Sequence, residues 1–218
     1  MIAFRLTFPQ NQCLQDMKGM ITVTKKVILM VLGAIGIILI SQVFAHGNNS
    51  TYEYPYAADS PEWSALSRQE RLDACQIPEE ILRGMSTEAL IDTVLAYPMR
   101  ADLLVFETYR QGFTKIYEEF NGLRELVSRD GAGLGLLEKY MAMKVGEPET
   151  ITEMMFIEVI LAQREFTAKT DQTIIDKIEE EARNKFQEKE KFPGIYGISK
   201  NTYFQAVQEQ GLDPGVGH

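Results

Sequence analysis

The side chains that could do chemistry are few in this 218-residue chain, and they lie far apart. The only histidines are His46 and His218, and the only cysteines are Cys13 and Cys75. A Ser–His or Cys–His pair cannot form within the body of the chain, and H-E-x-x-H, C-x-x-C and E-x-x-H spacings are absent. The sequence therefore predicts no catalytic residues, no metal ligands and no cofactor site.

Carboxylates are the one abundant reactive group, with 31 Asp and Glu side chains. A glycoside hydrolase needs two of them roughly 5–10 Å apart across a cleft. Most acidic residues here fall on the expected outward faces of helices. A carboxylate-based hydrolase of wall glycans is therefore kept only as an alternative function.

The glycine-rich run from Asp130 to Gly135 (DGAGLG) resembles a phosphate-binding loop only superficially. Its glycines alternate instead of following G-x-G-x-x-G, no strand pattern precedes them, and no G-K-[ST] follows. We expect a turn that opens the next helix, which carries Leu134, Leu137, Tyr140 and Met141 as its apolar residues.

The first 45 residues have the organisation of a secretory signal peptide. Lys25 and Lys26 precede the apolar run Val27–Ile40, and small or β-branched residues lead up to Ala45. The prediction is cleavage after Ala45, with a true start at Met17 or Met20. The alternative is that residues 27–45 stay uncleaved and anchor the protein in a membrane.

Cleavage there would leave an acidic chain with one cysteine. The whole sequence has 22 basic and 31 acidic side chains, and residues 1–45 contain four of the basic and one of the acidic ones. The remaining 173 residues thus carry a net charge of −12, which disfavours nucleic acid and anionic lipid as partners. Cys75 would be alone, and we expect it to be a small buried hydrophobe.

The rest of the chain reads as a series of short capped helices. An extended linker is expected over 46–59, a helical domain over 60–192, and a C-terminal tail with one weak helix over 193–218. The predicted helix starts are Ser60, the capping boxes Ser67–Glu70 and Thr150–Glu153, Pro78, Ser86, and Thr170 or Asp171.

Two of these helices have informative patterns. Residues 154–166 are apolar around most of the helix circumference, which predicts a position at the centre of the fold. The helix after Asp171 is expected to point the following residues inward: Ile174, Ile175, Ile178, Ala182 and Phe186. Its other face is expected to be charged and solvated: Glu179, Glu180, Glu181, Lys185, Glu188 and Lys189.

No period-2 strand pattern is present after residue 45. The predicted fold class is therefore all-α: an orthogonal bundle or short α-solenoid of about seven or eight short helices, preceded by an N-terminal signal helix.

Several short motifs occur in a characteristic order: C-Q-I-P at 75–78, M-S-T-E-A-L at 85–90, Y-P at 97–98, F-N-G-L-x-E-L at 120–126 and L-L-E-K-Y at 136–140. In these motifs the chain resembles a family of uncharacterised secreted bacterial all-helical domains. The resemblance covers about residues 63–145. It implies export and a helical fold, and it implies no activity, cofactor or partner.

The function predicted by these observations is a secreted or cell-surface binding module, whose partner is an unknown protein or envelope component. Contact with a membrane is expected only through the N-terminal segment, if that segment is uncleaved. The second alternative, besides the hydrolase, is an accessory helical domain of a secreted enzyme.

Overall fold

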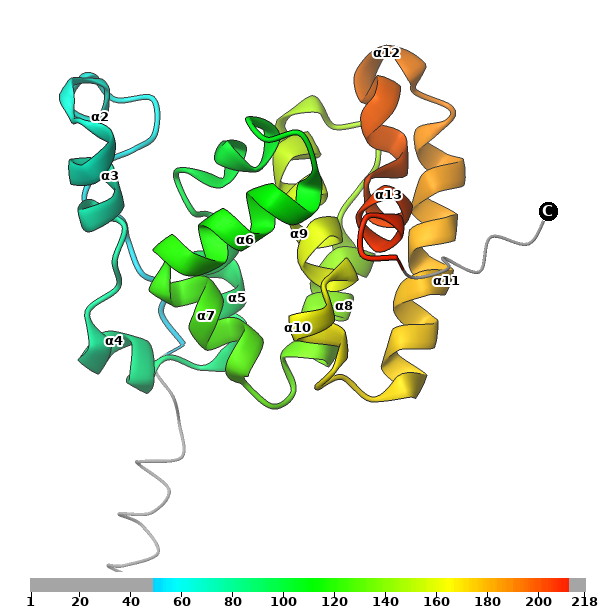
Figure 1. Ribbon diagram of the computed structural model, residues 1–218, viewed down its shortest axis with the longest axis horizontal. Coiled ribbons are helices and arrows are strands. Elements are labelled where there is room, and N and C mark those ends of the chain that lie inside the picture. Colours follow the sequence, from blue (N-terminus) through cyan, green and yellow to red (C-terminus); the bar gives the residue numbers. More distant parts are fainter. Residues whose placement is uncertain (1–48, 212–218) are drawn as a thin grey trace, which may run out of the picture. The chain divides into compact units, whose positions relative to one another are not determined.

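Residues 49–211, the part of the chain that the computed structural model describes, contain helices and no β-strand (Figure 1). Eight of the helices have seven residues or more, so the all-α prediction is confirmed. None of the helices in this range is long and apolar enough to cross a membrane. The predicted signal segment 1–45 lies outside the described residues.

The helices follow one another in this order: α2 (Pro61–Ala65), α3 (Arg68–Ala74), α4 (Glu79–Gly84), α5 (Thr87–Leu95), η1 (Arg100–Leu104), α6 (Tyr109–Glu119), α7 (Asn121–Ser128), α8 (Ala132–Ala142), η2 (Pro148–Thr150), α9 (Ile151–Ala162), α10 (Arg164–Thr167), α11 (Gln172–Lys189), α12 (Pro193–Tyr196), η3 (Gly197–Asn201) and α13 (Thr202–Gln208).

Side-chain caps begin most of the helices for which the sequence predicted them. Ser67 and Glu70 form the complete capping box of α3. Ser60, Ser86 and Asp171 each accept a hydrogen bond from a backbone N–H in the first turn of α2, α5 and α11. These caps pair N–H groups that have no partner within their own helix.

The predicted capping box of α9 is wrong. The Thr150 hydroxyl does not cap the helix but donates to the carbonyl of Glu147, at 2.9 Å. Because the 3₁₀ turn η2 runs directly into α9, Thr150 has helical backbone angles and cannot take the extended conformation of a cap.

Helix α9 lies at the centre of the fold, as its pattern predicted. All nine residues from Met154 to Ala162 are buried. The helix contacts α13, α8, α6, α5, η1 and α10, and in Figure 1 it lies between α6 and α13. Helix α9 thus packs against elements that precede it and elements that follow it in the chain.

Helix α11 departs from its predicted pattern on one face. Lys185 and Lys189 are buried, with 5% and 1% of their surface exposed, although the sequence predicted them on the solvated face. Each ammonium group has a buried or half-buried oxygen as its partner, described below, and this pairing allows a lysine to enter a core.

The segment that precedes α2 packs on the helical body. The Tyr52 backbone N–H donates to Thr93 Oγ1 at 3.0 Å, and the Tyr54 hydroxyl donates to the Thr93 carbonyl at 3.0 Å. The Tyr54 ring also lies 6.4 Å from both Tyr97 and Phe120, which are stacked on each other at 4.2 Å. These three tyrosine and phenylalanine rings fix the predicted linker to its own domain.

The helical body continues beyond residue 192. Helix α13 buries Tyr203, Phe204 and Ala206, and it packs directly against α9. The last turn is closed by Gly211, whose φ is +69°. Residues 212–218 lie outside the described residues.

Candidate functional site

The sequence named few reactive side chains, and the one that the structure describes is inaccessible. Cys75 is fully buried at the end of α3. Burial, with a smaller contribution from Asp102, raises the pKa of its thiol to about 12. A thiol in this state is a packing group and a poor nucleophile. His46 and His218 lie outside the described residues.

The glycine run opens helix α8 and allows it to pack closely. Gly131 precedes the helix with φ +80°, a conformation that favours glycine. A Cβ on Gly133 would lie 2.7 Å from Thr170 Cγ2, and one on Gly135 would lie 2.7 Å from Ile91 Cδ1. Gly131 thus lies in the turn that the sequence predicted, whereas Gly133 and Gly135 lie within α8 and permit its close packing, which the sequence did not predict.

One pair of carboxylates lies close together at the surface. Arg68 Nη2 is 3.4 Å from Asp102 Oδ2 and 2.8 Å from Glu119 Oε2. Burial raises the pKa of Asp102, whereas hydrogen bonding from Arg68 lowers that of Glu119. A raised pKa on one carboxyl group and a lowered pKa on its neighbour are typical of a general acid and a general base in an active site. Here, however, one guanidinium lies between the two groups, so the arrangement is an ion-pair network that ties α3 to η1 and α6.

A second polar cluster lies entirely inside the core. Glu158 Oε1 accepts hydrogen bonds from the Tyr140 hydroxyl and from Lys189 Nζ, both at 2.5 Å. Glu158 Oε2 is buried and has no hydrogen-bond partner among the described residues. Burial raises the pKa of Glu158 and that of Tyr140. Because Glu158 and Lys189 expose 2% and 1% of their side chains, no substrate reaches this cluster.

Sequence reasoning missed this cluster, although one signal was available. Glu158 is the only charged residue between Met154 and Ala162, within an otherwise apolar helix. An acid on the central helix must find a buried cation. Helix α11 carries three lysines, Lys177, Lys185 and Lys189, and the structure assigns Lys189 as the partner.

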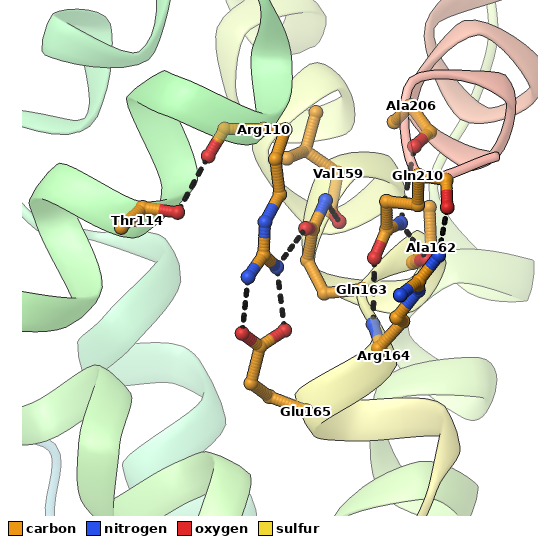
Figure 2. Close-up of polar contacts among 9 residues, drawn as sticks. All are labelled: Arg110, Thr114, Val159, Ala162, Gln163, Arg164, Glu165, Ala206 and Gln210. Carbon is orange, nitrogen blue, oxygen red and sulfur yellow. Dashed lines mark hydrogen bonds and ion pairs between the residues drawn. The ribbon is translucent and has the colours of Figure 1, made fainter.

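A network of charged and amide side chains joins three elements at the end of α9 (Figure 2). Arg110 of α6 donates to both carboxylate oxygens of Glu165, at 2.6 and 2.5 Å, and to Gln163 Oε1 at 2.9 Å. Gln210 donates to the Ala162 carbonyl at 2.6 Å and accepts from the Arg164 N–H at 2.9 Å. Since these donors and acceptors are paired with one another, the network joins α6 and the chain after α13 to α10.

An open groove of about 540 Å³ runs between α8 and α11. Leu134, Leu137 and Met141 of α8 lie along one side of it. Leu134 and Met141 are 46% and 57% exposed, which is unusual for large apolar side chains. The groove continues past Met141 into a second hollow of about 510 Å³, which ends at Phe192. We call the two hollows together the α8–α11 groove.

Helix α11 forms the opposite wall of the α8–α11 groove with one face. The residues of that face recur at helical spacing: Lys177, Glu180, Glu181, Asn184, Lys185 and Glu188. Lys191, just after the end of the helix, continues this wall. From Lys177 to Glu188 the helical wall spans roughly 16 Å along the helix axis. An apolar side and a polar side face each other over this length.

Among the features of residues 49–211, the α8–α11 groove is the one that is both open and lined by exposed apolar side chains over several helical turns. The sequence placed its apolar residues on one helix but gave no reason to expect them at the surface. No protein-family model, curated protein or solved structure matches the chain. The resemblance drawn from the C-Q-I-P and F-N-G-L-x-E-L motifs therefore stays a prediction.

Proposed function

We propose that this protein is a binding module of the cell envelope or the extracellular space, and that it holds a protein partner in the α8–α11 groove. The observation that carries the proposal is the row of exposed apolar side chains at positions 134 and 141 of α8. No described segment of the chain covers them.

Burial of this row would supply the driving force for binding. Each Å² of apolar surface removed from water contributes about 25 cal/mol. Leu134 and Met141 lie two helical turns apart on one face of α8, a spacing that matches the apolar stripe of a helix or an extended segment laid alongside.

Charged side chains around the groove would supply specificity. Six of them are exposed and have no ion-pair partner among residues 49–211: Glu138, Lys144, Lys177, Glu180, Glu188 and Lys191. A partner with complementary charges would pair with them at the rim, where such contacts select the partner and speed association more than they tighten it.

The decisive experiment is site-specific photo-crosslinking in the full-length protein. A photoreactive amino acid is placed at Met141, or at Val105 as a control, which is 72% exposed and lies outside the α8–α11 groove. After irradiation of intact cells, the protein is recovered from the envelope and medium fractions.

We expect a discrete adduct from position 141 that is absent from position 105. Equal labelling from both positions, or no adduct from position 141, would contradict binding in the groove. Recovery of the protein only from the cytoplasm would contradict the proposed location.

A further inference from the structure

The charges along the α8–α11 groove are separated by sign. The half nearer the start of α11 carries Glu138, Glu180, Glu181 and Lys177, for a net charge of −2. We call it the acidic half. The half nearer the end of α11, which we call the basic half, carries one carboxylate and three ammonium groups, for a net charge of +2: Glu188, Lys144, Lys185 and Lys191.

One ion pair within the molecule offsets part of this separation. Lys185 Nζ lies 3.4 Å from Glu181 Oε1, and it also donates to the Met143 carbonyl at 2.5 Å. When that pair is set aside, the acidic half keeps a net charge of −1 and the basic half keeps +1. The separation by sign therefore remains, and it rests on the six exposed side chains that have no ion pair.

Met141 lies at the boundary between the two halves, since it lines both hollows. Consider a two-fold axis that passes beside Met141, lies in the plane of the contact and crosses the long direction of the groove at right angles. A rotation of 180° about this axis exchanges the two ends of the groove. The same rotation would place the acidic half of one molecule opposite the basic half of another. The α8–α11 groove is thus complementary in charge to a copy of itself.

We propose that the partner in the α8–α11 groove is a second copy of this chain, an inference that rests on the proposed binding function. The two copies meet face to face around a two-fold axis beside Met141, the symmetry of most homodimers. The exposed Leu134 of each copy then lies toward the exposed Phe192 of the other. Glu138 and Glu180 meet Lys144 and Lys191 across the interface.

The expected dimer is weak. A groove whose helical wall is roughly 16 Å long, with few apolar residues, belongs to the smallest class of specific interfaces. The net negative charge of the chain also opposes association of two copies. We expect a dissociation constant on the order of micromolar, so that the dimer forms in proportion to local concentration.

The position of the axis is tested by thiol crosslinking of the full-length protein. Cys13 is replaced by Ser in every variant, and Cys75 is buried and does not react. Met141→Cys is compared with Val105→Cys, using a short bis-maleimide. We expect a product of twice the chain mass from Met141→Cys and none from Val105→Cys.

The charge pairing is tested by reversal in the Met141→Cys background. Glu180→Lys changes the acidic half to a net +1, against a basic half of +1, and Lys191→Glu changes the basic half to −1, against an acidic half of −1. Each single reversal places like charges face to face and should lower the crosslinked fraction about fivefold or more. The double variant restores opposite signs and should recover the crosslinked fraction.

The outcomes separate this inference from the proposed function. Recovery of the crosslinked fraction in the double variant supports the two-fold dimer. Binding to an unrelated partner would instead weaken further with each charge reversal. No crosslinked dimer, or no recovery, overturns the dimer. If the photo-crosslinking at Met141 then gives an adduct with another protein, the binding function stands with a different partner. If that adduct is also absent, both proposals fail.

Discussion

Lys189 of α11 and Glu158 of α9 form a fully buried ion pair with a separation of 2.5 Å. The Tyr140 hydroxyl of α8 donates to the same carboxylate oxygen, so one atom of the central helix holds two neighbouring helices. This contact fixes the rotation of α11, and with it the face of α11 that lines the groove.

Removal of the buried cation should be strongly destabilising. Lys189→Met leaves the Glu158 carboxylate buried without a counter-ion, and we expect a loss of about 3–5 kcal/mol in the free energy of unfolding. The double variant Glu158→Leu, Lys189→Met should lose much less than the sum of the single variants. Urea unfolding measures the free energy of unfolding of the single variants and of the double variant. Lys177→Met, an exposed lysine of the same helix, is the control and should change stability by no more than about 0.5 kcal/mol.

The Arg110–Glu165 contact should make stability depend on acidity. Hydrogen bonding from Arg110 lowers the pKa of Glu165 below its ordinary value of 4.5. Since the folded pKa is the lower one, the contact stabilises the fold above pH 4.5, and this contribution is lost as the pH falls through the folded pKa.

The measurement is the difference in urea midpoint between the native chain and Glu165→Gln, from about pH 7 to about pH 3. We expect a difference at neutral pH that shrinks in acid. Glu188→Gln, whose carboxylate has no ion-pair partner among the described residues, should unfold like the native chain at neutral pH. A Glu165→Gln difference that is constant across the range would contradict the prediction.

Gly112 lets α6 approach η1 closely, so a methyl group there should be disruptive. A Cβ on Gly112 would lie 2.5 Å from the Leu103 carbonyl oxygen, which belongs to the backbone and cannot rotate away. We expect Gly112→Ala to lower the free energy of unfolding by about 1–3 kcal/mol. Gly84→Ala is the matched control, because a Cβ there has no neighbour within 4 Å. It should be neutral or slightly stabilising, because alanine is the better helix former.

The Cys75 thiol should be protected until the chain unfolds. It is fully buried and its pKa is raised to about 12, so very little thiolate forms at neutral pH. In a Cys13→Ser chain, we expect no alkylation by iodoacetamide under native conditions and one adduct in concentrated urea, read by intact mass. Rapid alkylation of the native chain would show that α3 opens.

Local signals in the sequence were sufficient for the helical class and for most of the capped helix starts, with the start of α9 as the exception. Ser67, Ser86 and Asp171 cap helices because the capping bond joins a side chain to a backbone group two or three residues away. The central place of α9 also follows from composition, since a helix that is apolar on all sides must be covered on all sides.

Contacts between helices decided the rest. The sequence placed Lys189 in water, and the structure buries it. The sequence identified Leu134 and Met141 only as apolar residues of their helix, and the structure leaves them exposed. The reason is that burial depends on which neighbour covers a given face. Lys189 faces the carboxylate of Glu158 on α9. Helix α8, in contrast, has apolar residues on more of its circumference than its neighbours cover.

The sequence by itself determined an all-α chain with an acidic composition, two histidines, two cysteines and one helix suited to the centre, because each of these depends on residue type and local spacing. Only the tertiary structure decided the buried Glu158–Lys189 pair and the α8–α11 groove. Both arise from residues more than 30 positions apart, brought together by packing that no local pattern encodes.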